Sequence, residues 1–123
     1  MAGIFSITGR LADMGVLKHF LQVPKIKGVA RYILADRNGE VVIHNMKGYK
    51  NKGSLISFCT EQAWSIGRGK VHYLVFTRRS GEDLFIFPVG NYSLGVVKEK
   101  DIQTVELISS VLEFLNGLDI KRS

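Results

Sequence analysis

The chain has 123 residues, of which 46% are hydrophobic and 23% are charged. These are ordinary values for a globular protein, and no segment is apolar for long enough to cross a bilayer. Because the chain has a single cysteine and no secretory signal pattern, we expect one domain over residues 1–123, with its core at about 11–118, located in the cytoplasm.

The net charge of +6 raises the question of a polyanionic partner such as a nucleic acid. The basic residues fall in different segments, and only the loop Lys47–Lys52 and the pair Arg78–Arg79 form local clusters. Such a dispersed excess is typical of a solvated basic surface. The sequence therefore argues against nucleic-acid binding and leaves the role of the basic loop open.

The first half of the chain predicts a helix followed by a hairpin. Apolar residues recur every three or four positions from about Arg10 to Leu21, and Pro24 should close this helix. Two β-prone runs, 28–35 and 40–44, follow on either side of Asp36-Arg37-Asn38-Gly39. Asn-Gly between such runs is a strong hairpin signal, because both residues accept positive φ.

A second helix is expected from the N-cap Ser54 to about Ile66. On a helical wheel one stripe should face the sheet, and it contains Leu55, Ile56, Cys59, Ala63 and Ile66. Phe58 flanks this stripe. Trp64 lies roughly opposite, beside Ser57, Thr60 and Glu61.

The stretch Lys70–Lys98 predicts three consecutive antiparallel strands, separated by turn residues at 79–82 and at Gly90-Asn91. Both parities of these strands are apolar, so the sheet should be covered on both faces. A last helix should begin at the N-cap Asp101 and extend to about Leu118. The predicted fold is an α/β three-layer sandwich, an antiparallel sheet of about five strands with helices on both faces.

This pattern resembles the roadblock/LC7 family, including the members related to the polarity protein that partners a small Ras-like GTPase. The resemblance covers about Leu11–Leu118 and is carried by Gly28-Val29, by Leu34–Gly39, and by Leu84–Val89 leading to Leu94–Val97. Two segments depart from the family pattern, the basic spacer Val23–Lys27 and the apolar run Glu40–His44. The resemblance implies a non-enzymatic scaffold or regulatory protein. It would pair with itself or with a second roadblock-like chain, and bind a small GTPase or a signalling or motility complex.

In such a dimer the second helix and the third strand of each subunit meet. The strand 70–77 is apolar on both faces and lacks proline, so an open edge there would invite pairing with another chain. Large aromatic residues outside the sheet-facing stripe suit a contact between helices. The interface residues predicted in this way are Phe58, Glu61, Trp64, Val71, Tyr73 and Val75. Alternatively, Trp64 packs on the loop 45–52.

The sequence offers no pattern for catalysis, a metal site or a cofactor. His19, His44 and His72 have no Cys or second His at metal-ligand spacing, and Cys59 on the buried stripe should be an inert core thiol. Candidate contacts to a partner are Arg68, Arg78 and Arg79, one of which could act as an arginine finger, although the sequence favours the alternative that they are solvated turn residues. The alternative is a small-ligand-sensing module of the related profilin/PAS-like architecture, which would use a cavity between sheet and helices.

Overall fold

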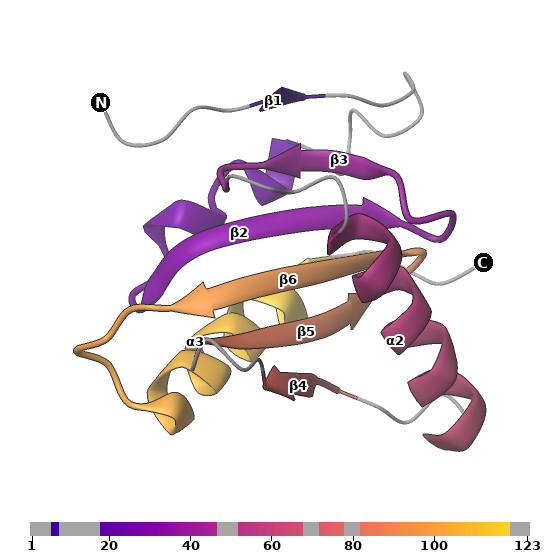
Figure 1. Cartoon of the computed structure of the whole chain (residues 1–123). Coiled ribbons are helices and arrows are strands. Elements are labelled where there is room, and N and C mark those ends of the chain that lie inside the picture. Colours follow the sequence, from indigo (N-terminus) through magenta and orange to yellow (C-terminus); the bar gives the residue numbers. More distant parts are fainter. Residues whose placement is uncertain (1–5, 8–17, 47–51, 68–71, 78–81, 119–123) are drawn as a thin grey trace.

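A computed structural model describes residues 6–7, 18–46, 52–67, 72–77 and 82–118. The described residues form one six-stranded antiparallel sheet with helices on both of its faces (Figure 1). The elements in chain order are β1 (Ser6–Ile7), the 3-10 helix η2 (Val23–Lys25), β2 (Val29–Asp36), β3 (Val41–His44), α2 (Lys52–Gly67), β4 (Leu74–Thr77), β5 (Asp83–Val89), β6 (Tyr92–Lys98) and α3 (Thr104–Asn116). The strand order across the sheet is β1-β3-β2-β6-β5-β4.

The hairpin between β2 and β3 forms where the sequence predicted it. The Asp36 carboxylate accepts hydrogen bonds from the backbone N–H groups of Asn38 and Glu40, at 2.9 and 3.0 Å. Gly39 adopts a φ of +83°, which only glycine reaches without strain. The side chain of Asp36 and the backbone of Gly39 thus fix the turn together.

The predicted meander is also confirmed. β5 and β6 pair over six residue positions, from Leu84 opposite Val97 to Val89 opposite Tyr92, and Gly90 turns between them with a φ of +60°. β4 pairs with β5 from Leu74 opposite Ile86 to Thr77 opposite Asp83. The described strand is shorter than the predicted 70–77, because residues 72–73 have no regular structure and 70–71 lie outside the described part.

Two buried clusters, one on each face of the sheet, make the three-layer arrangement. On one face, Leu107 and Val111 of α3 and Phe20 pack against Phe85 and Phe87. On the other face, the α2 residue Ile56 packs against side chains from β2, β5 and β6. Alternate residues of β5 therefore enter different clusters, which confirms the sandwich fold; the structure adds β1 to the five expected strands.

The boundaries of two helices, α2 and α3, differ from their predicted positions. Most of the expected helix 10–21 lies outside the described residues, although 18–20 are helical. α2 begins at Lys52 rather than after Ser54, and α3 begins after Gln103 rather than at Asp101. Gln103 is extended at the N-cap position and makes no side-chain cap hydrogen bond, so apolar packing fixes this start more than capping does. Among the described residues, no helix combines the length and the apolar character needed to span a bilayer.

Candidate functional site: the exposed surface of α2 and β4

The orientation of α2 on the sheet differs from the helical-wheel prediction. Ser57 and Thr60, expected on the outer side, are buried with 6% and 2% of their surface exposed. Cys59 and Leu55, expected to face the sheet, are only half-buried. The helix is therefore rotated so that small hydroxyl side chains, together with Ile56 and Ala63, contact the sheet.

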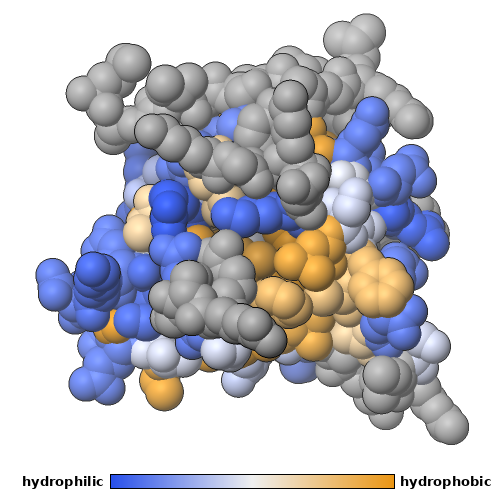
Figure 2. Space-filling model, viewed as in Figure 1, coloured by the Kyte–Doolittle hydropathy of each residue, from blue (hydrophilic) through white to orange (hydrophobic). Residues whose placement is uncertain are grey.

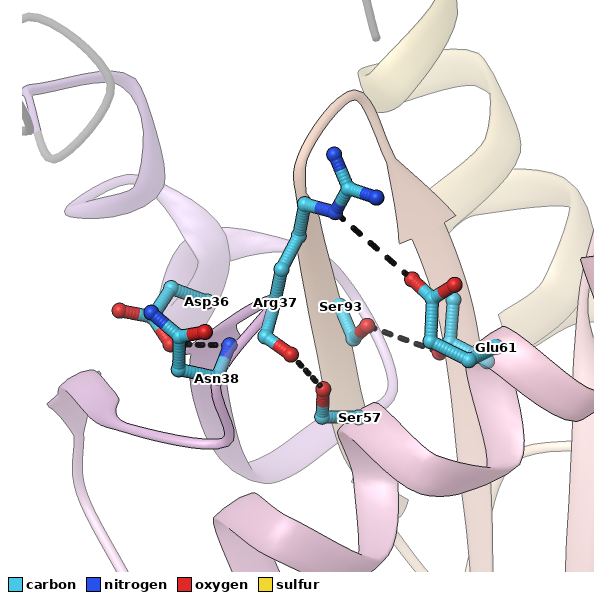
Figure 3. Close-up of polar contacts among 7 residues, drawn as sticks. Asp36, Arg37, Asn38, Ser57, Glu61 and Ser93 are labelled. Carbon is cyan, nitrogen blue, oxygen red and sulfur yellow. Dashed lines mark hydrogen bonds and ion pairs between the residues drawn. The ribbon is translucent and has the colours of Figure 1, made fainter. Parts of the chain in front are cut away.

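Polar contacts explain this rotation (Figure 3). The Ser57 hydroxyl donates a hydrogen bond of 2.7 Å to the backbone carbonyl of Arg37, in the hairpin after β2. The Ser93 hydroxyl on β6 donates to the Thr60 hydroxyl at 2.8 Å. Arg37 Nε also lies 3.9 Å from a carboxylate oxygen of Glu61. Because the buried hydroxyls have partners, polar residues can occupy the sheet-facing side of α2.

Gly95 on β6 lets α2 approach the sheet closely. A Cβ atom at this position would lie 2.7 Å from Ile56 Cδ1 and 2.9 Å from Ile33 Cγ2. Both distances are shorter than a normal carbon–carbon contact. The absence of a side chain at Gly95 therefore sets the depth at which Ile56, and with it the whole helix, sits on the sheet.

The same rotation turns Phe58 into solvent, with 63% of its surface exposed. The other exposed side chains of α2 in the described part of the chain are Ser54, Gln62 and Ser65. None of these four carries a charge, and Lys52 and Glu61 are the only charged residues in α2. An exposed helix face without charges is unusual on a solvent-exposed protein surface and typical of the centre of a protein–protein interface.

An open apolar groove of about 290 Å³ lies between this face of α2 and the edge of the sheet. Its lining comes from α2, β4 and β5, and consists of Phe58, Cys59, Gln62, Ala63, Leu74, Val75, Phe76 and Ile86. Figure 2 shows apolar side chains gathered over this part of the molecule. In the described part of the chain, no strand pairs with the outer edge of β4, so the groove borders an open sheet edge.

The predicted interface residues in β4 and directly before it do not all lie on the sheet face that α2 covers. Leu74 and Phe76 point toward the sheet face that α2 covers, and they pack against the buried cluster that contains Ile56. Tyr73 points to the opposite side, where its ring lies 6.2 Å from that of Phe87. Tyr73 and Val75 alternate with Leu74 and Phe76 and are 41% and 46% exposed, so exposed apolar side chains also lie on the face opposite the groove residues Leu74 and Phe76.

The remaining predicted residues are placed as follows. Glu61 is half-buried and its carboxylate lies 3.9 Å from Arg37 Nε. Trp64 lies within α2, four residues after the buried Thr60, and its side chain is outside the described part. Val71, Arg68, Arg78, Arg79 and most of the basic loop (47–51) also lie outside the described residues. Sequence reasoning missed Leu74, Phe76 and Gln62 as groove residues, and the lack of charge in α2 was the signal available for finding this face.

Cys59 borders the groove instead of lying in the core. Its thiol is free and half-buried, and this burial raises the pKa of the thiol above its ordinary value, which disfavours the nucleophilic thiolate. No group of three or more His, Cys, Asp or Glu side chains within the described ranges could hold a metal ion. The chemistry of the groove is therefore that of apolar contact, with one amide, Gln62, at its border.

Comparison with solved structures matches the same arrangement of sheet and helices. A roadblock/LC7 domain from Streptomyces avermitilis superposes with a TM-score of 0.59 at 17% identity, covering 79% of this chain and 88% of that one. Myxococcus xanthus MglB superposes with a TM-score of 0.63 at 14% identity, covering 88% and 93%. The chain has the roadblock/LC7 fold.

A third structure with the roadblock/LC7 fold is the gliding protein MglB from Thermus thermophilus. It superposes with a TM-score of 0.61 at 10% identity, covering 91% of this chain and 96% of that one. No protein-family model matches the sequence, and no curated protein matches it. The likeness to roadblock/LC7 domains is thus a likeness of fold, spanning nearly the whole length of these structures.

Proposed function

We propose that the chain is a non-enzymatic scaffold that pairs with a second copy of itself through α2 and β4, and that the dimer binds a small Ras-like GTPase. The observation that carries the first part is the open edge of β4 beside an exposed, uncharged face of α2. The second part rests on the sequence resemblance to roadblock/LC7 domains and on the shared fold.

The edge of β4 favours pairing between two sheets. Unpaired backbone N–H and C=O groups on an edge strand form a template for another strand, and natural proteins normally block such edges with Lys, Pro or a covering element. The sequence Leu74-Val75-Phe76-Thr77 contains neither Lys nor Pro. A second β4, related by a two-fold axis, would satisfy these groups and place two α2 helices near each other.

Charge and hydrophobicity favour α2 as the neighbouring part of the contact. Each protomer carries a net charge of +6, so two copies repel each other unless they meet through a surface without charges. The exposed face of α2 is such a surface. Full burial of the Phe58 ring contributes about 1.5–3 kcal/mol per protomer, enough to make it the principal contact of the interface.

A platform of this kind acts by binding rather than by catalysis. It can shift a GTPase between nucleotide states only if it binds one state more tightly than the other. In our proposal the charged contacts to that partner come from Arg68, Arg78 and Arg79, which follow α2 and β4 in the sequence. The groove itself has only Gln62 as a polar side chain able to anchor a ligand, which favours a protein surface over a polar small molecule.

The dimer is tested by placing a charge on two exposed apolar positions in turn. Phe58→Asp should reduce the molar mass measured by light scattering from that of a dimer to that of a monomer, because a carboxylate would be desolvated in the contact. Val105→Asp is the matched control, since Val105 is 74% exposed on α3. A dimer that survives Phe58→Asp, or that is split equally by Val105→Asp, would place the contact elsewhere.

Partner binding is tested separately with purified Ras-like GTPases from the same organism, loaded with GDP or with a non-hydrolysable GTP analogue. We expect titration calorimetry to show tighter binding of one nucleotide form to the dimer. Val105→Asp, which keeps the dimer in our proposal, serves as the control for surface charge. Equal affinity for both forms would contradict a regulatory role, while leaving the dimer intact.

A further inference from the structure

The sheet has a second edge, and β1 lies on it. Ser6 is paired with His44 and Ile7 with Ile43 in antiparallel register. Figure 1 shows β1 running along the outer side of β3, at the opposite end of the sheet from β4. The contact is small, with two residue positions against the seven that join β2 to β6.

The side chains of β3 do not protect it as an edge strand, although the strand has only four residues and its pairing with β2 shifts register between Leu34 and Ala35. Its sequence is Val41-Val42-Ile43-His44, without Lys, Pro, Gly or an acidic residue. The side chains of Val42, Ile43 and His44 are buried, so packing in the core fixes the position of the strand and of its free edge. An apolar strand that is fixed by the core in this way can accept a new strand once its edge is open.

We propose that β1 is an edge guard. By pairing with Ile43 and His44, two of the four residues of β3, it hinders a second copy of the chain from docking there, and it leaves β4 as the edge available for assembly. If both edges were open, each protomer could pair on two sides, and the assembly would grow without closing. The role of β4 in this scheme rests on the proposed function, whereas the protection of β3 does not.

The test removes the hydrogen-bonding capacity of β1 in the full-length chain. In an antiparallel ladder successive residues direct their N–H groups to opposite sides, so one of Ser6 and Ile7 addresses β3. Replacing both, Ser6→Pro with Ile7→Pro, removes the donor in either case. The matched control, Ser6→Thr with Ile7→Val, keeps both N–H groups and a high preference for β structure.

We expect light scattering to show that the proline variant has at least twice the molar mass of the control at equal concentration. The same doubling should occur in the Phe58→Asp background, where it would produce a dimer joined through β3. The readout is therefore a ratio to the matched parent, and it remains valid if the β4 contact proves wrong.

Two results would contradict the proposal that β1 protects the edge of β3. One is an unchanged molar mass in a proline variant whose circular dichroism matches that of the control, since β3 would then be open and still not pair. The other is loss of the native circular dichroism spectrum, because β1 would then be part of the structural core. Ser6→Gly with Ile7→Gly, which keeps the N–H groups but weakens the strand, should give a smaller increase in mass.

Discussion

The Ser93 hydroxyl donates a hydrogen bond of 2.8 Å to the Thr60 hydroxyl, and this buried pair joins β6 to α2. Thr60→Val keeps the shape of the side chain and removes the acceptor, leaving the Ser93 hydroxyl without this partner. We expect the free energy of unfolding, measured with urea, to fall by about 1–3 kcal/mol. Adding Ser93→Ala to Thr60→Val should restore part of the lost free energy of unfolding, because the unpaired Ser93 hydroxyl is then removed. Strict additivity of the two changes would contradict a direct bond.

The close approach at Gly95 gives a second prediction. Gly95→Ala would place a methyl group against Ile56, Ile33 and Leu84, and we expect overpacking to lower the free energy of unfolding by about 1–3 kcal/mol. Gly117→Ala is the control, since its nearest atom would be the Phe114 carbonyl oxygen at 3.4 Å and the backbone φ is −79°. If Gly95→Ala and Gly117→Ala were equally stable, the packing of α2 on the sheet would not depend on the lack of a side chain at Gly95.

Tyr32 has a buried hydroxyl with no hydrogen-bond partner among the described residues. Its burial within the apolar cluster raises the pKa of the phenol above its ordinary range. Tyr32→Phe should leave the free energy of unfolding unchanged or increase it by about 1 kcal/mol, because an unpaired polar group leaves the core. Tyr73→Phe, at an exposed ring, controls for loss of a hydroxyl as such. A clear loss of stability in Tyr32→Phe alone would show that residues outside the described part bond this hydroxyl.

His44 links the stability of the fold to pH. Burial lowers its pKa from the ordinary value of about 6.5, so the unfolded chain binds a proton more readily than the folded one. The stability associated with this group is complete above the unfolded pKa and declines as the pH falls from about 6.5 toward the lower folded pKa. Melting temperatures should therefore decrease from about pH 7.5 to 5.5 in the unaltered chain, and decrease less in His44→Gln. An identical pH dependence in both proteins would assign the effect to another group.

The sheet could be predicted from the sequence because local signals determine it. Asp36 and Gly39 form a turn by themselves, and Gly90 marks the next reversal, so the intervening runs had to be strands. The doubled apolar parity at Leu84–Phe87 indicated helices on both faces, which the two buried clusters confirm. Turn chemistry and period-2 patterns act over a few residues and are visible in a single chain.

The orientation of α2 could not be predicted in the same way. A helical wheel that sorts residues by hydrophobicity assigns Ser57 and Thr60 to solvent. In the structure Ser57 bonds a backbone carbonyl 20 residues away, and Thr60 bonds a serine 33 residues away. The predicted start of α3 was wrong for a related reason. The Asp101 side chain is well suited to cap a helix, but the helix begins three residues later. Long-range hydrogen bonds and packing override local preference at both places.

We propose that the open edge of β4 and the uncharged face of α2 bring two copies of the chain together. Light scattering of the unaltered chain at micromolar concentration measures this directly. We predict a molar mass of twice the 13.7 kDa of one chain, which falls toward 13.7 kDa only on strong dilution. A mass of 13.7 kDa throughout that range would contradict it.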